Sequence, residues 1–301
     1  MNKIVVITGP TATGKTALGV RLAKKFNGEI ISADSRQVYK YLDVGTGKDK
    51  SEYKDVPVWG LDLVEPDYKY NVSEFVDYAN KKITEILERN KLPIVVGGTG
   101  QYIKELFWPS ETLHIPQDKG LRESLNRLSV EELQLQLQEI SFPKWETMNV
   151  SDRQNPRRLI RAIEVCKVHK VNKVSKVIYE PLIIGLAAPP EILDKRICER
   201  VEKRWPLMPA ELESLKVHKV SKVKAFGYQG ETLEEWKQEE IKYARRQIRY
   251  LAKMIPKIFW LDITNKNLLR QVENMVQNYL NRGNQRNGNQ KSQSAEKVSP
   301  D

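Results

Sequence analysis

Residues 9–16 read Gly-Pro-Thr-Ala-Thr-Gly-Lys-Thr, which matches the pattern G-x-x-x-x-G-K-[ST]. It follows an apolar run at residues 3–8, and a helical pattern over residues 16–26 begins directly after it. A strand, a glycine-containing loop and a helix in this order bind phosphate, because the loop N–H groups point at the anion and the helix N-terminus adds partial positive charge. The stretch therefore predicts a site for a diphosphate or polyphosphate group.

The positions within this loop have distinct expected roles. Lys15 is placed to reach the outer phosphate, and the hydroxyl of Thr16 is placed to hold Mg²⁺. The alternative is a glycine-rich turn that binds nothing, and the flanking strand and helix patterns favour the phosphate site. The predicted phosphate-binding residues of the loop are Gly9, Pro10, Thr11, Ala12, Thr13, Gly14, Lys15 and Thr16.

The composition is typical of a soluble globular protein, with 301 residues that are 40% hydrophobic and 30% charged. The two cysteines, Cys166 and Cys198, are too few for a disulfide framework and have no metal-ligand spacing, which indicates a reducing compartment. No apolar run approaches the roughly 20 residues that span a membrane, and the N-terminal run predicts a strand instead of a signal peptide. We therefore expect a cytoplasmic protein with no membrane partner.

The net charge of +11 is concentrated in the second half of the chain. Residues 241–260 carry six positive charges and no acidic residue, and residues 216–224 carry four lysines and no acidic residue. Such segments favour a polyanionic partner, of which nucleic acid is the natural example. The alternative is a basic surface that is only solvated. His169 and His218 lie within lysine-rich stretches, so we expect both side chains to be solvated and not catalytic.

The first third of the chain alternates strand and helix patterns. The predicted strands are residues 3–8, 29–33 and 93–96, and the predicted helices are residues 16–26 and 73–90, with Ser73 at the N-cap. Near-continuous apolar strands that alternate with helices predict an α/β fold with a parallel sheet covered on both faces. In such sheets ligands bind at the carboxyl ends of the strands, so the loops that follow them are the candidate site.

An all-helical insertion is predicted to interrupt this sheet. Helical patterns cover residues 119–128, 129–140 and 156–170, and Ser129 begins a capping-box pattern. The sheet pattern resumes afterwards: the expected elements are a strand at 181–188, helices at 190–204, 209–220 and 233–254, a strand at 258–262 and a helix at 267–281. The predicted organisation is a catalytic core of residues 1–112 and 181–281, a helical insertion of residues 113–180, and a disordered polar and basic tail of residues 282–301.

Two further loops follow predicted strands and carry chemically useful groups. In the first, Asp34 could accept a proton or bind an amine, and the Gln37 amide could read a base edge. Asp34 could instead cap a helix, which is the better interpretation of that residue taken alone. In the second loop, residues 97–102, Thr99 offers a hydroxyl where many nucleotide triphosphatases have an acidic Mg²⁺ ligand, which weakens a hydrolase interpretation.

Taken together and in order, these motifs resemble the signature series of the tRNA dimethylallyltransferases, the bacterial tRNA isopentenyltransferases. The resemblance covers roughly residues 3–262, and the set is specific although each motif after the phosphate loop is weak alone. The matching segments are residues 9–16, 34–39, 46–48, 97–102, 155–165, 226–228 and 244–247.

This resemblance implies transfer of a dimethylallyl group from dimethylallyl diphosphate to N6 of the adenosine just 3′ of the tRNA anticodon, with Mg²⁺ as cofactor. It implies a P-loop kinase-like core with a helical insertion, and the anticodon stem-loop bound between them. Asp34 would accept the amine proton, while Lys15, Thr16 and Mg²⁺ would stabilise the departing diphosphate, and Thr99 would help to hold the adenosine. We expect a monomer.

The resemblance also assigns contacts to tRNA and to the diphosphate. Lys224 stands where the family usually has arginine, so a point charge would replace a bidentate fork at the diphosphate. The residues implied to bind tRNA are Asp34, Ser35, Arg36, Gln37, Thr99, Arg122, Arg157, Arg158, Leu159, Ile160 and Arg161.

Three other functions compete with this one. Prenylation of free adenine nucleotides such as AMP would need neither the long insertion nor the basic second half. A nucleotide or small-molecule kinase usually has the acidic residue that is missing after residue 96. An RNA-binding protein with a vestigial phosphate loop is favoured only by Lys224.

Overall fold

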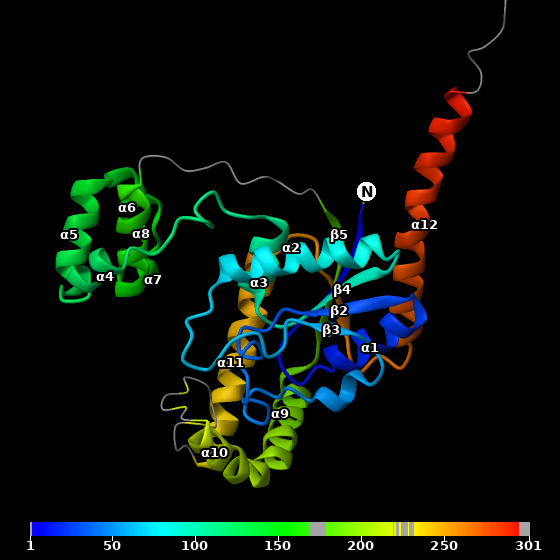
Figure 1. The fold of residues 1–301 in the computed structure, drawn as a ribbon, viewed down its shortest axis with the longest axis horizontal. Coiled ribbons are helices and arrows are strands. Elements are labelled where there is room, and N and C mark those ends of the chain that lie inside the picture. The colour runs from blue at the N-terminus through cyan, green and yellow to red at the C-terminus, as the bar shows by residue number, and fades with distance from the viewer. Residues whose placement is uncertain are drawn as a thin grey trace, which may run out of the picture. The chain divides into compact units, whose positions relative to one another are not determined.

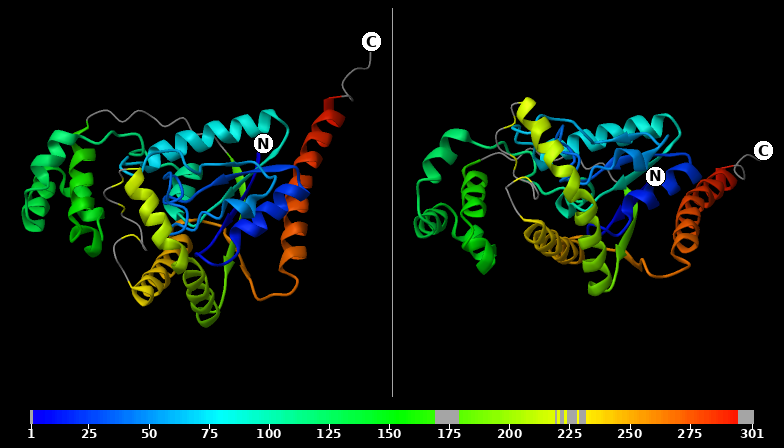
Figure 2. Two further views of the ribbon diagram at one scale, coloured as in Figure 1. Left: turned by 60° about the horizontal axis from the view of Figure 1, so that its bottom comes forward. Right: turned by 90° about the horizontal axis from the view of Figure 1, so that it is seen from below.

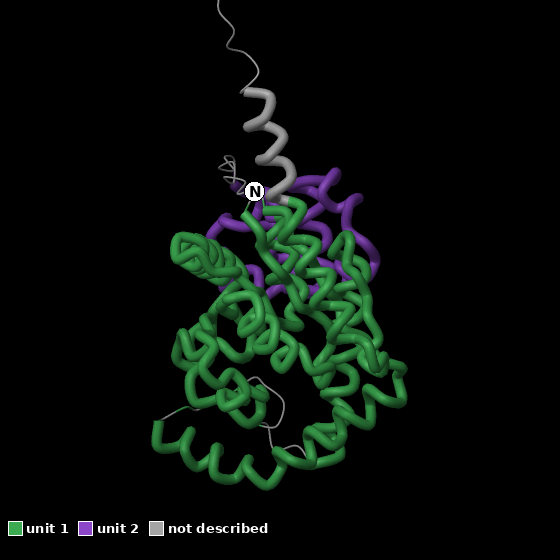
Figure 3. The backbone as a smooth tube through the Cα atoms, turned by 90° about the vertical axis from the view of Figure 1, so that its right-hand side faces the viewer, with its two compact units in different colours: residues 1–108, 178–301 green, residues 109–177 purple. Residues whose placement is uncertain are grey.

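The computed structural model describes residues 2–168, 179–218, 220, 223, 228 and 232–294, with side chains in the last helix to residue 282. The chain divides into two compact units (Figures 1 and 3). Unit 1 contains residues 1–108 and 178–301, and unit 2 contains residues 109–177. The insertion predicted from the sequence spans residues 113–180, and the roles assigned to the two parts stay predictions.

Unit 1 is built on a six-stranded sheet in which every pair of neighbouring strands is parallel. The strand order is β3-β2-β4-β1-β5-β6, which confirms the predicted parallel α/β core. The strands are β1 Lys3–Thr8, β2 Gly28–Ser32, β3 Val58–Trp59, β4 Leu92–Val96, β5 Glu180–Ala187 and β6 Phe259–Asp262. The two-residue β3 was not predicted, because a run this short shows no periodicity.

Strand β1 is buried on both faces, as its unbroken apolar sequence predicts. Val5 and Ile7 pack with helices α1 (Lys15–Lys25) and α12 (Leu268–Ser294), which lie side by side in Figures 1 and 2. Lys25 Nζ of α1 bonds Glu273 Oε2 of α12 at 2.5 Å. Helices α2 (Val72–Glu88) and α3 (Gly100–Phe107) cover the opposite face, where α2 packs on β2 and β4.

Helix α2 begins one residue earlier than predicted. Its N-cap is Asn71, whose side chain accepts hydrogen bonds from the backbone N–H groups of Ser73 and Glu74. Glu74 in turn accepts from the Asn71 backbone, which completes a capping box. Ser73 lies inside the helix, so its assignment as the N-cap was wrong: the Asn at 71 has the extended backbone that a cap requires.

Three helices form a second core beside the sheet in unit 1: α9 (Pro190–Arg204), α10 (Met208–Val217) and α11 (Leu233–Met254). Their apolar faces enclose the fully buried Trp236. The bounds of α9 and α11 agree with the sequence prediction, because both have long, regular helical patterns. Two short 3₁₀ helices, η1 (Lys50–Tyr53) and η2 (Trp205–Leu207), complete the described part of this unit.

The described residues of unit 2, 109–168, contain helices joined by turns and no strand. A small apolar core joins α5 and α8 through Leu133, Leu137, Leu159 and Ile163. The predicted capping box is confirmed, because Ser129 and Glu132 exchange hydrogen bonds at the start of α5. Its helices are α4 (Lys119–Leu125), α5 (Val130–Ile140), α6 (Phe142–Thr147), α7 (Val150–Arg153) and α8 (Pro156–Lys167).

Helix α12 continues to Ser294, beyond residue 282, where the composition predicted disorder to begin. Residues 295–301 lie outside the described part of the chain. No helix in the described residues is long and apolar enough to cross a membrane.

Truncation of the sheet centre provides a test of this core. Ile94 of β4 is fully buried, so Ile94→Ala should lower the free energy of unfolding by about 2–5 kcal/mol through lost burial and a cavity. Val217, which is 79% exposed, provides the control, and Val217→Ala should change it by less than about 0.5 kcal/mol. Urea unfolding measures both, and equal effects would contradict the assignment of Ile94 to the core.

Candidate active site

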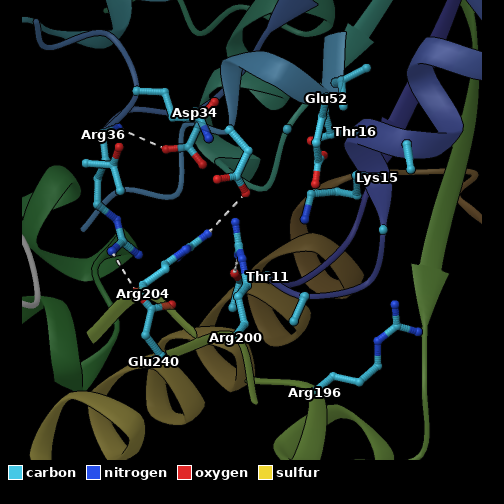
Figure 4. Close-up of a pocket in the computed structure, with 18 of the residues that line it drawn as sticks. Thr11, Lys15, Thr16, Asp34, Arg36, Glu52, Arg196, Arg200, Arg204 and Glu240 are labelled. Carbon is cyan, nitrogen blue, oxygen red and sulfur yellow. Dashed lines mark hydrogen bonds and ion pairs between the residues drawn. The ribbon is translucent and has the colours of Figure 1, made fainter. Parts of the chain in front are cut away.

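The carboxyl ends of β1, β2 and β4 meet at one edge of the sheet, because these strands are neighbours. The three predicted loops therefore come together around a cavity of about 600 Å³ (Figure 4). Helices α9 and α11, residues 46–53 and Leu207 supply the rest of its lining. The cavity thus lies at the carboxyl ends of the strands, where the sequence predicts the site.

The phosphate loop runs from Gly9 to the start of α1. Gly9 has a φ of +137°, and a Cβ there would overlap the carbonyl oxygen of Leu186 in β5. Gly14 is the N-cap of α1, with a φ of +84°. Thr13 Oγ1 donates to the carbonyl of Pro10 at 2.9 Å, which holds the loop closed upon itself.

Lys15 is directed toward the loop that precedes it. Its Nζ donates to the Pro10 carbonyl at 2.6 Å, and Figure 4 shows it at the cavity with Thr16 and Asp34 nearby. Burial, followed by the positive charge of Arg200, lowers the pKa of Lys15 to about 7, while Asp34 and Glu240 act in the opposite direction. A phosphate group at this point would stabilise the charged form of Lys15.

Gln247 of α11 joins the phosphate loop to the loop after β4. Its Oε1 accepts from the Thr11 N–H at 2.9 Å, and its Nε2 donates to the Gly98 carbonyl at 3.1 Å. The side chain is buried, so both bonds are sheltered from water. Sequence reasoning included Gln247 in a motif but gave it no role, because its partners lie far away in the chain.

Asp34 lines the cavity at the end of β2, and a turn follows it. The interpretation of Asp34 as a helix cap was therefore wrong, because no helix begins there. One carboxylate oxygen, Oδ1, accepts from the Arg36 N–H at 2.9 Å. Thr99 reaches the same loop, since its Oγ1 accepts from the Ser35 N–H at 3.0 Å and lies 3.3 Å from Ser35 Oγ.

Arg36 and Gln37 both contact other parts of the protein. The Arg36 guanidinium lies 3.3 Å from a Glu240 oxygen and 3.9 Å from the centre of the Tyr243 ring. Gln37 accepts from Ser32 Oγ at 3.1 Å and donates to the Gly47 carbonyl at 3.2 Å. These contacts hold the loop in place, and RNA contacts by Arg36 and Gln37 stay predictions.

Helix α9 supplies basic groups that sequence reasoning missed. Arg196, Arg200, Lys203 and Arg204 line the cavity from one face of the helix. Arg200 donates to Thr11 Oγ1 at 2.5 Å and to the Gly47 carbonyl at 3.3 Å. The signal was present as basic residues at positions i, i+4, i+7 and i+8, which share a helix face.

The segment that carries Gly47 is held by Glu211 of α10. The Glu211 carboxylate accepts from the N–H groups of Asp43, Val44 and Gly45 at 3.0, 2.6 and 3.2 Å. The Tyr228 hydroxyl also donates to this carboxylate. Glu211 therefore fixes the backbone that meets Arg200.

Lys48 has a structural role within the same segment. Its Nζ is fully buried, where it donates to the Tyr39 carbonyl at 2.6 Å and pairs with Asp43 at 2.9 Å and Asp62 at 2.5 Å. These partners occupy its three donor positions.

The predicted RNA-binding residues of unit 2 fall into different environments. The guanidinium of Arg122 makes two 2.7 Å bonds to the buried carboxylate of Glu164. Arg161 donates to the carbonyls of Thr112 and Ile115 at 2.9 Å. These two arginines stabilise unit 2. Arg122 neutralises the buried Glu164 carboxylate, and Arg161 binds two backbone carbonyl groups.

Helix α8 presents the other four. Leu159 and Ile160 are only 0% and 4% exposed, so the expected RNA contact of their side chains is corrected to a packing role. Arg157 and Arg158 are exposed and remain predicted RNA contacts. Lys224, the predicted diphosphate ligand, lies outside the described residues.

The low pKa of Lys15 has a measurable effect on stability. Between pH 7 and pH 9 the unfolded chain holds a proton on Lys15 that the folded protein releases, so the free energy of unfolding should rise with pH. Relative to Lys15→Met, the wild type should gain up to about 1 kcal/mol per pH unit in this range. Urea unfolding at several pH values measures the difference, and parallel profiles would contradict it.

Comparison with known protein families gives two matches. The model of the family described as IPP transferase matches residues 37–254, and that described as isopentenyl transferase matches residues 2–55. Among curated relatives, a tRNA dimethylallyltransferase from Leuconostoc mesenteroides is 36% identical over 87% of this chain and 93% of its own length. One of the same name from Geobacillus thermodenitrificans is 37% identical over 87% and 91%.

Solved structures of tRNA-modifying transferases are also similar to this chain. A tRNA isopentenylpyrophosphate transferase from Bacillus halodurans has a TM-score of 0.70 and 30% identity, covering 96% of this chain and 100% of its own. A eukaryotic dimethylallyltransferase described as acting on tRNA has a TM-score of 0.75 and 25% identity, covering 87% and 74%. Since the family model spans most of the chain and relatives above 30% identity cover it almost fully, this protein belongs to the IPP transferase family.

Proposed function

We propose that this protein transfers a dimethylallyl group from dimethylallyl diphosphate to N6 of the adenosine just 3′ of the anticodon in tRNA. The observation that carries the proposal is the position of Asp34, a carboxylate that shares one cavity with the phosphate loop and Lys15. Relatives named tRNA dimethylallyltransferase, and a structural neighbour described as acting on tRNA, support the choice of substrates. We also propose that the protein acts as a monomer in the cytoplasm, where its tRNA substrate is found.

The proposed reaction needs a base, because the adenine N6 lone pair is delocalised into the ring and is a poor nucleophile. As N6 attacks C1 of the donor, the C1–O bond breaks and its electron pair leaves with diphosphate. The proton lost from N6 passes to Asp34, whose Oδ1 is held by the Arg36 N–H. The adenosine has to leave the stack of the anticodon loop to reach C1.

The charge that develops on the diphosphate meets groups already in place. The loop amides at the N-terminus of α1, Lys15 and the α9 residue Arg200 all lie at this cavity. Fixed donors of this kind stabilise a transition state because they do not have to reorganise as the charge appears. Thr99, bonded to the Ser35 N–H, is proposed to keep the Asp34 loop in position.

Mg²⁺ is the proposed cofactor, and the residues present fit it. The described residues contain no group of three or more His, Cys, Asp or Glu side chains that could hold a metal alone. Mg²⁺ commonly binds through one or two protein groups together with substrate phosphates, which suits Thr16 beside a diphosphate. When bound, the ion would neutralise charge on the leaving group. Tyr53, which bonds Thr16 and whose pKa burial raises to about 12, would remain a neutral neighbour.

Replacement of Asp34 tests the proposed proton acceptor. Asp34→Ala and Asp34→Asn should each lower the rate of prenyl transfer by about 10²–10⁴-fold. Mass spectrometry of nucleosides from an unmodified tRNA, incubated with Mg²⁺ and dimethylallyl diphosphate, measures the product. Asp55→Asn is the control, since the Asp55 side chain is 96% exposed and does not line the cavity. A rate within threefold of wild type in Asp34→Ala would remove Asp34 from the mechanism.

Competition between acceptors separates this function from prenylation of free nucleotides. With equal concentrations of AMP and an anticodon stem-loop, we expect the label of a radioactive donor to enter the RNA almost exclusively. AMP alone offers no partner for the exposed Arg157 and Arg158 of unit 2. Preferential labelling of AMP would favour the nucleotide-modifying activity, and turnover of ATP without a prenyl donor would favour a kinase.

A further inference from the structure

Two arginines of α9 bring their positive charges together at the cavity. Arg200 and Arg204 lie one turn apart, and a Cβ at Gly47 would overlap a terminal nitrogen of each. Arg200 donates hydrogen bonds to two neutral partners, the Thr11 hydroxyl and the Gly47 carbonyl. Among the residues that the structure describes, no carboxylate is hydrogen-bonded to either guanidinium, although Asp49, Glu240 and Glu52 lie near enough to oppose the lowering of the Arg204 pKa.

Arg204 is the less satisfied of the two. It is only 7% exposed, and its buried Nη2 has no hydrogen-bond partner in the described part of the chain. Its ion pair with Asp49 is 3.8 Å long, beyond hydrogen-bonding distance, and the Asp49 side chain is half exposed. Burial, followed by the charge of Arg200, lowers the pKa of Arg204 to about 10. A buried charge with an unused donor is costly unless a ligand completes it.

We propose that Arg204, together with Arg200, forms a phosphate-binding fork on the side of the cavity formed by α9. The ligand group is a phosphate with non-bridging oxygens, which suits the planar donor pattern of two guanidinium groups. Figure 4 shows both side chains directed into the cavity that also receives Lys15. The phosphate comes either from the diphosphate of the donor or from the backbone of the acceptor RNA, and only that choice of sources rests on the proposed function.

The contact of Arg200 with the phosphate loop favours the donor. Arg200 is hydrogen-bonded to Thr11 of the phosphate loop and to Gly47, and a terminal nitrogen of Arg204 lies beside Gly47. The two guanidinium groups therefore extend the row of hydrogen-bond donors that the phosphate loop begins. A diphosphate has two phosphate groups. The loop amides and Lys15 would bind one of them, and the fork would bind the oxygens of the other. Loss of one charge-assisted contact of this kind weakens binding by about ten- to hundredfold.

The test measures binding of inorganic diphosphate with Mg²⁺ by isothermal titration calorimetry. Arg204→Met keeps the apolar part of the side chain and removes its charge, while Arg204→Lys keeps the charge without the fork. We expect a ten- to hundredfold weaker affinity in Arg204→Met and a smaller loss in Arg204→Lys. Lys195→Met is the matched control, because Lys195 is an exposed base of the same helix that does not line the cavity. It should change the affinity less than twofold.

A second arm identifies the source of the phosphate. Fluorescence anisotropy measures binding of a labelled anticodon stem-loop to the same variants, and thermal unfolding verifies that each is folded. A loss of affinity for diphosphate assigns the fork to the donor, and a loss for the stem-loop alone assigns it to the acceptor. Unchanged affinity for both ligands in a folded Arg204→Met would overturn the proposal.

These results are separable from those on the proposed function. If the wild type transfers no prenyl group but its diphosphate affinity depends on Arg204, the fork stands and the function is rejected. If the wild type prenylates tRNA while Arg204→Met binds both ligands normally, the function stands and the fork is rejected.

Discussion

The close approach of strand β5 to the end of β1 is the constraint on which the site depends. Gly9 begins the phosphate loop at a φ of +137°, against the carbonyl of Leu186, where no other residue would fit. Because β1 lies between β4 and β5, its loop has a packed neighbour on either side. The loop that leaves β1 is thus shaped by the sheet itself, and α1 begins where its amides can face an anion.

Around this loop, long-range hydrogen bonds fix the segments that line the cavity. Gln247 ties the loop to Gly98, and Glu211 holds the backbone that leads to Gly47. The same arrangement holds the half-buried Lys15 and Arg200 and the buried Arg204 at one cavity, and the pKa values of Lys15 and Arg204 are lowered. Charges that the fold holds in place in this way would bind a phosphate group without having to reorganise.

The sequence was sufficient wherever a pattern was long or local. Strand β1 and helices α9 and α11 were predicted closely, and Lys15, Thr16 and Asp34 all line the predicted cavity. The short β3 and α7 have too few residues to show a period. The pairing of Arg122 with Glu164 and of Gln247 with Thr11 could not be foreseen, because each joins residues that only the tertiary fold brings together. The same is true of Leu159 and Ile160. Their position in the motif predicted a contact with RNA, but their side chains pack in the core of unit 2.

The order of the strands also has a consequence for how the chain is made. Of the six strands of this sheet, β1 leaves the ribosome before the others, yet one of its two neighbours, β5, begins only at residue 180. The five helices of unit 2 are synthesised in the interval, and their core joins residues close in sequence. During this time one edge of β1 stays open, which slows folding and exposes an apolar strand to misassembly. A nascent chain stalled before residue 180 would therefore be a natural client for a chaperone.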